Sequence, residues 1–390
     1  MNKIALLFHV NFNHLSLSYR QRKEYIENYF EKTIDLITVP VTFSICCEDL
    51  LLLKCWNPKA FSKFVNHPHV KFVKSLYSHS IPQLFPNSHA NQIDLANRIY
   101  FDLIQSSKLL NICYSAEVDL PPEVVRHRYD GLILGETKIC INGLSQEKYP
   151  PVFYIDNGSS HKLIGYLSRR KFNFREYIHK LFRNEVDLDE TINQIKNDCS
   201  TFASNSVLVA RIDWEVIMLN QKHVNNKVTF LPFKIWGKFF SAMKSKNFKL
   251  YTIDQIEQNS QDIPIIRETD ILSCGEENNK WSNTQMVEFI NSFDITICSK
   301  EQLIVYYSLF CSDYYCSEFP NLIFPYLRDK TKEVVIHKNR LYRDQESATK
   351  LKMLTNNLDN TQLLSSIVDK DLQKYIYYFI KTINTSKKYL

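Results

Sequence analysis

The sequence is poor in glycine and lacks any long apolar run. Only 7 of its 390 residues are glycine, so its turns must rely mainly on Asn, Asp, Ser and Pro. No apolar run approaches the roughly 20 residues that a membrane-spanning helix needs. Residues 4–10 are apolar, but His9 interrupts them and no small-residue cleavage site follows. They therefore predict a buried strand rather than a signal peptide, and no membrane partner is expected.

The cysteines lack the spacing of a metal site. The ten cysteines include no Cys-x-x-Cys pair and no spacing typical of zinc ligands. Cys46 and Cys47 are adjacent in an apolar run, which favours two reduced core thiols over a disulfide framework. We therefore expect a reducing compartment, the cytoplasm, and no metal or cofactor. His67-Pro68-His69 could suggest a metal site, but no Asp lies at a matching spacing, and a loop is the better interpretation.

Charge of one sign does not cluster either. The 48 basic and 42 acidic residues give a net charge of +6 and are mixed along the chain. The densest basic run, Ser168-Arg169-Arg170-Lys171, is too short for a nucleic-acid footprint. A nucleic-acid partner is therefore not expected. The 44% hydrophobic and 23% charged residues are typical of a globular protein.

Apolar runs alternate along the chain with stretches of helical spacing. The runs predict buried strands at residues 4–8, 39–46, 70–73, 109–114, 130–134, 207–210 and 249–252. Helices are predicted at residues 19–37, 50–53, 92–110, 175–199 and 284–293. Such alternation predicts a mostly parallel sheet or a barrel. These folds place their chemistry at the carboxyl ends of the strands.

The pattern changes between residues 320 and 332, where Pro320, Pro325 and charged residues interrupt it. We therefore predict a catalytic-type (β/α) barrel over residues 1–320 and a small, mostly helical C-terminal cap over residues 321–390. Within the cap, residues 334–342 suggest a short hairpin. An apolar stripe from Leu372 to Ile383 predicts a helix.

Two acidic motifs each follow a predicted strand. Ser115-Ala116-Glu117 comes after the strand at 109–114, and Asp213-Trp214-Glu215 comes after the strand at 207–210. Two carboxylates brought together by separate strand ends are what glycosidic-bond chemistry needs: one attacks or stabilises the sugar carbon and the other transfers a proton. Taken alone, Glu117 would more commonly be a surface residue. Asp213 could equally cap a helix whose first turn holds Glu215.

Taken together, the motifs resemble those of glycoside hydrolase family 57 in order and spacing, over roughly residues 1–315. The family's first strand ends in a His-x-His-type motif, and Leu7-Phe8-His9-Val10-Asn11 stands in that place. A Tyr-x-His-Pro-Ile-x-Pro-like motif is similar to Tyr77-Ser78-His79-Ser80-Ile81-Pro82. A Gln-Ile pair that opens the next family helix is matched by Gln92-Ile93.

The acidic motifs extend the resemblance. The family's nucleophile lies in a Gly-x-Trp-x-x-Glu-like motif, which corresponds to Ile112-Cys113-Tyr114-Ser115-Ala116-Glu117. Its acid/base aspartate lies in an Asp-x-Glu motif, which is matched by Asp213-Trp214-Glu215. Cys311-Ser312-Asp313-Tyr314 weakly resembles a Ser-Asp-Trp motif near the end of the family's catalytic region.

The sequence also departs from the family pattern. Asn11 replaces the second His, Ser80 replaces Pro, Ile112 replaces Gly and Tyr114 replaces Trp. These changes affect the expected sugar specificity more than the expected chemistry, because both catalytic carboxylates of the family have counterparts in this sequence.

The resemblance implies a distorted seven-stranded (β/α) barrel of the glycoside hydrolase/deacetylase type, acting by a retaining mechanism without metal. Glu117 would attack the anomeric carbon, and Asp213 would protonate the leaving oxygen and then deprotonate water or an acceptor hydroxyl. That role requires a raised pKa at Asp213, and retention requires the two carboxyl groups to lie about 5–5.5 Å apart. The expected substrate-binding residues are His9, Asn11, His79, Trp214, Glu215, Trp281 and Asp313, with Trp214 or Trp281 as a flat face for a sugar ring.

The leading hypothesis is therefore an enzyme that cleaves or transfers an α-linked glycosyl unit of an oligo- or polysaccharide. One alternative is an inactive sugar-binding relative that keeps the barrel. The other is a metal-dependent polysaccharide deacetylase, which uses a related barrel and holds a cation with Asp and two His. His9, Asn11 and His14 do not make a convincing set for it. The sugar, the linkage, the acceptor and the oligomeric state stay open.

Overall fold

The computed structural model describes most of the chain. It covers residues 2–12, 18–82, 85–158, 163–168, 172, 174–182, 184–202, 206–214, 222–224, 227–229, 234–273, 290–311, 345–346, 348–354 and 360–390. At residues 86–88, 117, 124, 202, 222–224 and 227–229 it describes the backbone alone.

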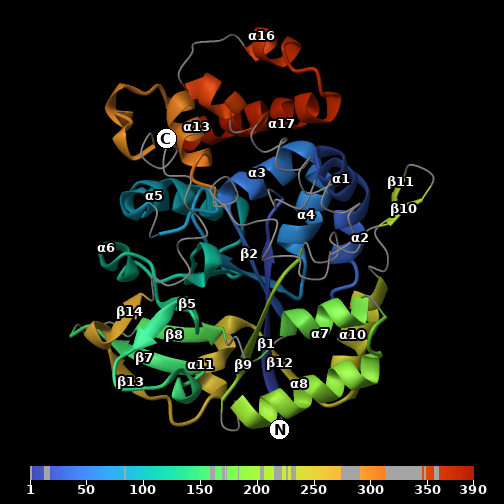
Figure 1. Cartoon of the computed structure of the whole chain (residues 1–390), viewed down its shortest axis with the longest axis vertical. Helices are drawn as coiled ribbons and strands as arrows, with labels where there is room; N and C mark the ends of the chain where they lie inside the picture. The colour runs from blue at the N-terminus through green and yellow to red at the C-terminus, as the bar shows by residue number, and fades with distance from the viewer. Residues whose placement is uncertain are drawn as a thin grey trace.

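Seven parallel strands close into a barrel (Figure 1). β9 returns to β1 with a register that runs from Ile4↔Leu208 to His9↔Asp213, and β8 meets β9 at Ser168↔Val209. The prediction of a distorted seven-stranded (β/α) barrel is therefore confirmed. In order around the barrel, the strands are β1 (Lys3–Val10), β2 (Val41–Ile45), β3 (Val70–Lys74), β4 (Leu109–Tyr114), β5 (Gly131–Gly135), β8 (Leu163–Ser168) and β9 (Leu208–Asp213).

Shorter strands extend the barrel sheet or pair beside it. β12 (Lys249–Tyr251) runs parallel to the start of β1. β7 (Val152–Asp156) is antiparallel to β8, and β13 (Ile265–Arg267) is parallel to β7. Two antiparallel pairs stand apart from this sheet, and they are formed by β6 (Ile139–Ile141) with β14 (Ile271–Ser273) and by β10 (Lys222–Val224) with β11 (Lys227–Thr229).

Side chains along each barrel strand alternate between the barrel interior and the surrounding helices, as strand geometry requires. On β1, Ala5 and Leu7 belong to the interior cluster, whereas Leu6 and Phe8 pack with the helices. β9 alternates in the same way, because Val209 lies in the interior cluster and Ala210 lies in the helical one. Both faces are apolar, which explains why the strands are continuous apolar runs.

Helices cover the outside of the barrel. α7 packs against β9, α4 and α5 pack against β3, and α10 packs against α8. A π-helical turn, η1 (Tyr25–Tyr29), joins α1 to α2 within the helix predicted at residues 19–37. The helices are α1 (Tyr19–Glu24), α2 (Phe30–Ile34), α3 (Cys47–Trp56), α4 (Pro58–Asn66), α5 (Pro86–Leu103), α6 (Glu123–Arg126), α7 (Phe174–Phe182), α8 (Leu188–Phe202), α10 (Lys234–Ser245) and α11 (Ile256–Asn259).

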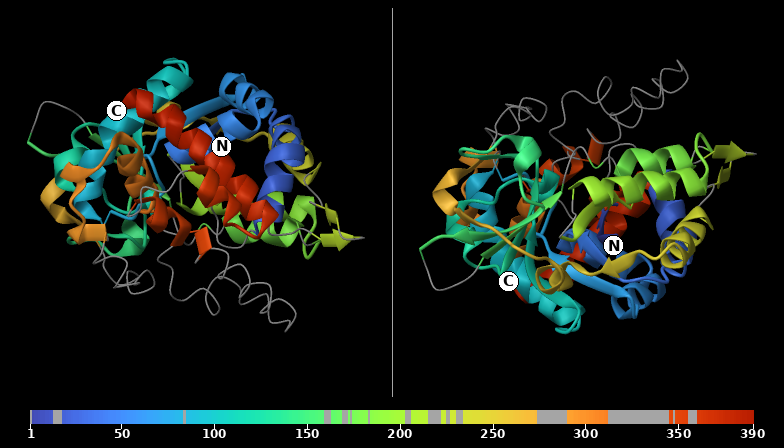
Figure 2. Two further views of the ribbon diagram at one scale, coloured as in Figure 1. Left: turned by 90° about the horizontal axis from the view of Figure 1, so that it is seen from above. Right: turned by 90° about the horizontal axis from the view of Figure 1, so that it is seen from below.

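The C-terminal helices lie at the carboxyl ends of the barrel strands. β1 starts near the N-terminus and runs toward α13 (Lys300–Ser308), α16 (Asn360–Ser365) and α17 (Lys370–Ser386) (Figure 1). Seen from above, α17 crosses the molecule, and it packs on α3 and α1 (Figure 2). The predicted C-terminal helix is thus confirmed. The predicted boundary at residue 320 and the hairpin at 334–342 lie outside the described residues, so the division into domains stays a prediction.

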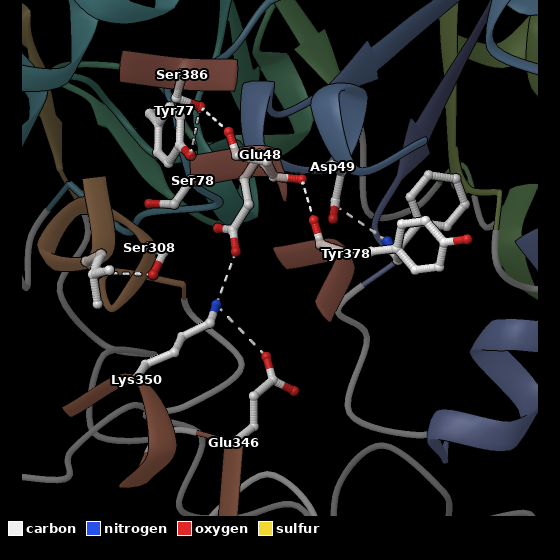
Figure 3. Close-up of polar contacts among 12 residues, drawn as sticks. Glu48, Asp49, Tyr77, Ser78, Ser308, Glu346, Lys350, Tyr378 and Ser386 are labelled. Carbon is white, nitrogen blue, oxygen red and sulfur yellow. Dashed lines mark hydrogen bonds and ion pairs between the residues drawn. The ribbon is translucent and has the colours of Figure 1, made fainter. Parts of the chain in front are cut away.

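A buried charge cluster joins the C-terminal segment to the barrel (Figure 3). The Nζ of Lys350 lies 2.8 Å from Oε1 of Glu48 at the start of α3 and 3.6 Å from Oε1 of Glu346. Nη1 of Arg22 on α1 lies 3.5 Å from Oε2 of Glu346. All four side chains are at most 1% exposed. Removing one partner of such a cluster would leave a buried charge uncompensated, so the cluster fixes how the C-terminal segment packs.

The state of the cysteines agrees only in part with the prediction of reduced thiols. Cys46 and Cys47 are buried free thiols, as predicted. Cys140 on β6, however, is disulfide-bonded, so the expectation of reduced thiols does not hold for every cysteine, and the compartment stays a prediction. Within the described residues, every helix is too short or too polar to cross a membrane.

Candidate active site

His9 and Asp213 lie side by side at the carboxyl edge of the barrel. His9 is the register partner of Ser44 on β2 and of Asp213 on β9. Register partners on parallel strands point to the same face, which here is the barrel interior that Ala5 and Leu7 also face. Nδ1 of His9 lies 3.4 Å from the Oγ of Ser44. The first predicted motif and the predicted acid/base residue therefore share one edge.

Three aromatic rings stack at this edge. His9 stacks on His79 with ring centroids 4.5 Å apart and on Tyr114 with centroids 4.9 Å apart. All three side chains are almost completely buried. The stack therefore links the ends of β1 and β4 to the segment that follows β3.

The segment that carries His79 is held from two sides. The backbone N–H and the hydroxyl of Ser78 both donate to Oε1 of Gln92 on α5, at 3.1 and 3.2 Å. Ser80 forms an antiparallel β-bridge with Cys311. Two motifs that the sequence places apart, around His79 and around Gln92, are thus in direct contact.

Glu117 follows β4 in the 3₁₀ turn η2 (Ala116–Val118). The hydroxyl of Ser115 donates to the carbonyl of Asp119 across this turn. Val118 has a φ of 53°, a left-handed conformation that is strained for a β-branched residue, and such strain concentrates at functional sites. The backbone of Glu117 therefore lies three residues beyond Tyr114 at the same barrel edge, while the predicted separation of its carboxyl group from that of Asp213 stays a prediction.

Two arginines contact the carboxylate of Asp213. Nη2 of Arg211 lies 3.3 Å from Oδ1, and Nη1 of Arg175 on α7 lies 3.4 Å from Oδ2. The side chain of Asp213 is 14% exposed. Both guanidinium groups favour the ionised carboxylate, whereas a general acid must hold a proton. The predicted role of Asp213 therefore requires this pairing to loosen during the reaction.

Trp214 faces away from the site, and the prediction that it offers a face to a sugar ring is wrong. It is fully buried and lies against Phe8, Phe43 and Trp236, with ring centroids 4.8 to 5.3 Å apart. The cause is strand alternation: Asp213 faces the barrel interior, so its neighbour faces the helices.

The remaining predicted substrate-binding residues divide into two groups. Asn11 is described and is 3% exposed, just beyond the end of β1. Glu215, Trp281 and Asp313 lie outside the described residues. Their roles stay predictions.

Arg211 and Arg175 are not among the site residues that the sequence predicts. The sequence does contain a sign that Arg211 belongs to the site. Arg211 lies two residues before Asp213, and strand alternation places both side chains on one face. Arg175 gave no such signal, since it lies in a charged helical segment far from Asp213 in sequence.

The deacetylase alternative would need a cluster of metal ligands. The described residues contain no group of three or more His, Cys, Asp or Glu side chains arranged to hold a metal ion. This part of the structure therefore gives that alternative no ligand set.

The fold is similar to solved structures of carbohydrate-active enzymes. A 4-α-glucanotransferase from Thermococcus litoralis matches with a TM-score of 0.51 and 14% identity, over 100% of this chain and 60% of its own length. An α-amylase from Thermotoga maritima matches with a TM-score of 0.54 and 12% identity, over 97% of each chain. An exo-type maltose-forming amylase from Pyrococcus sp. ST04 matches with a TM-score of 0.51 and 12% identity, over 97% of this chain and 83% of its own.

At these identities the likeness establishes the fold, which is that of glycoside hydrolases and glucanotransferases. The fold implied by the resemblance in the sequence is thus confirmed. No family model and no curated protein sequence matches the chain.

Proposed function

We propose that this chain is a divergent member of glycoside hydrolase family 57 that cleaves or transfers an α-linked glycosyl unit of an oligo- or polysaccharide. The main support for this proposal is the register of β1 with β9, in which His9 lies beside Asp213. The stack of His9 on Tyr114 adds the strand end that leads to Glu117. Motifs far apart in the sequence thus meet at the barrel edge where such folds carry their chemistry.

In the proposed mechanism the two carboxylates act in turn. Glu117 attacks the anomeric carbon while Asp213 gives its proton to the leaving oxygen, and a glycosyl-enzyme forms. Asp213 then takes a proton from water or from an acceptor hydroxyl, whose oxygen displaces Glu117 and restores the original anomeric configuration. Water gives hydrolysis, and a second glycan gives transfer.

The structural neighbours support this proposal by their activities. They are named a 4-α-glucanotransferase, an α-amylase and a maltose-forming amylase. All three names describe work on α-linked glucose chains. The substrate class that we propose is therefore an α-glucan.

One observation favours the alternative of an inactive sugar-binding relative. Both oxygens of Asp213 are engaged by guanidinium groups, which oppose its protonation. If neither contact loosens when a sugar binds, the site can recognise a glycan without cleaving its bonds.

The stereochemistry of the first product tests the proposed function. Purified protein is incubated with maltoheptaose, and the anomeric protons are followed by ¹H NMR from the first minutes. We expect the α-anomer to form first and the β-anomer to follow by mutarotation, because two displacements retain the configuration. A β-anomer formed first would contradict the retaining mechanism. Oligosaccharide binding without any product would favour the inactive relative.

A further inference from the structure

Tyr114 joins the ring stack to the charged part of the site. Its ring lies nearly parallel to that of His9, at an interplanar angle of 15°. Its Oη accepts a hydrogen bond of 2.7 Å from Nε of Arg211. Tyr114 is completely buried at the end of a barrel strand, so Arg211 is held by a fixed partner.

The two arginines on Asp213 are held differently. Arg211 comes from β9 itself, is 22% exposed and is bound by Tyr114. Arg175 comes from the first turn of α7 and is 45% exposed. Fixing a side chain that is already partly ordered costs less entropy than fixing a half-exposed one. Arg211 is therefore the better placed of the two to hold Asp213 in one orientation.

We propose that Arg211, anchored by Tyr114, is the positioning residue for Asp213: it holds Oδ1 and leaves Oδ2 as the oxygen that carries the transferable proton. Arg175 then withdraws from Oδ2 when substrate binds. The proton is taken from solvent, passes to the leaving oxygen, and is replaced from the attacking water or acceptor hydroxyl. This inference rests on the proposed function, since it assigns the working oxygen of the proposed acid/base residue.

The chemistry of the tyrosine explains why this chain needs it here. A phenol can accept a hydrogen bond from Nε of Arg211, whereas an indole N–H can only donate. A tryptophan, as in the motif that the sequence resembles, would leave that N–H of Arg211 without this acceptor. Tyr114 and Arg211 therefore form a matched pair.

Tyr114→Phe tests the inference, because it removes the hydroxyl and keeps the ring that stacks on His9. With maltoheptaose we expect kcat to fall by roughly 10- to 100-fold while KM changes little, since a misplaced catalytic group slows the chemical step. Tyr166→Phe is the matched control, because Tyr166 is also buried in the barrel interior, on β8. It should leave kcat unchanged, and thermal unfolding of both variants checks the fold.

A second readout does not depend on turnover. The carboxyl group of Asp213 is titrated by ¹³C NMR in the wild type and both variants, with Asp213→Asn to assign the signal. The described groups around it include Arg211 on β9, Arg175 on α7 and His9 on β1. We expect Tyr114→Phe to raise the midpoint, because a released Arg211 stabilises the ionised form less.

Activity and the titration midpoint together distinguish an incorrect positioning role for Arg211 from an incorrect proposed function. A wild type without turnover, together with a raised midpoint in Tyr114→Phe, would contradict the proposed function and leave the positioning of Asp213 standing. A Tyr114→Phe variant that matches Tyr166→Phe in both kcat and midpoint would overturn the inference, even in an active enzyme.

Discussion

Glu117→Gln is expected to reduce kcat on maltoheptaose by at least about 10³-fold, because it replaces the proposed nucleophile with an amide that cannot form the glycosyl-enzyme. The substitution keeps the size of the side chain, so thermal unfolding should change little. The loss is measured as initial rates of product formation at matched protein concentration.

Glu123→Gln is the matched control for this result. Glu123 is exposed, lies six residues further along the chain and opens α6. Its substitution should leave the rate near that of the wild type. Equal rates for Glu117→Gln and the wild type would show that Glu117 is not the nucleophile.

The second large effect concerns the pH dependence of stability, through Asp49 on α3. Asp49 is 1% exposed, and Oδ2 accepts a 3.1 Å hydrogen bond from the backbone N–H of Phe12. Burial raises the pKa of Asp49 to about 7, and the charge of Glu48 adds to this, while Arg22 opposes it. The folded protein therefore keeps a proton on Asp49 in a pH range where the unfolded chain has released it.

This difference in pKa makes the free energy of unfolding decrease as pH rises. The unfolded pKa is about 3.9, so stability falls as pH rises from about 4 to about 7, where the folded state must ionise a buried carboxyl group. At about 1.4 kcal/mol per pH unit, the loss is of the order of 4 kcal/mol. Asp49→Asn, which can still accept from Phe12, should abolish it.

Chemical denaturation at several pH values between 4 and 8 measures this effect as the difference between the wild type and Asp49→Asn. We expect the variant to gain stability relative to the wild type as pH rises. Asp189→Asn is the control, because Asp189 is 72% exposed in its pair with Lys246 and such pairs contribute little. A difference that does not depend on pH would contradict the protonated state of Asp49.

Most of the barrel could be predicted from the sequence because its strands are apolar on both faces. Six of the predicted runs correspond to β1, β2, β3, β4, β5 and β9. The sequence does not predict β8, because Gly165 weakens its strand signal. The structure gives the reason for the glycine: a Cβ at this position would lie 2.5 Å from the ring of Phe153 on β7.

The helix predicted at residues 92–110 shows how element boundaries can be misjudged. α5 starts earlier, with Pro86 in its first turn, where proline is favoured. It ends at Leu103, because Leu109 and Leu110 belong to β4. The sequence predicts both a helix and a strand at these two residues, because the helix at 92–110 overlaps the strand at 109–114, and pairing with β3 and β5 decides for the strand.

The sequence predicts the motifs of the candidate site but not the contacts that its arginines make. The alternation of a strand already places Asp213 and Trp214 on opposite faces, so the sequence itself indicates that Trp214 turns away from the site. The contact of Arg175 with Asp213, and of Tyr114 with Arg211, depends on how α7 and β4 pack around β9. Such contacts are set by the tertiary structure and have no local signal.

A crystal structure that shows the separation of the carboxyl groups of Glu117 and Asp213 tests the proposed chemistry at its core. We expect a separation of about 5–5.5 Å, with both groups facing the space beside His9, because a retaining pair must reach one anomeric carbon. A separation of about 9 Å would indicate an inverting pair, and carboxyl groups on different faces of the barrel would contradict the proposed chemistry altogether.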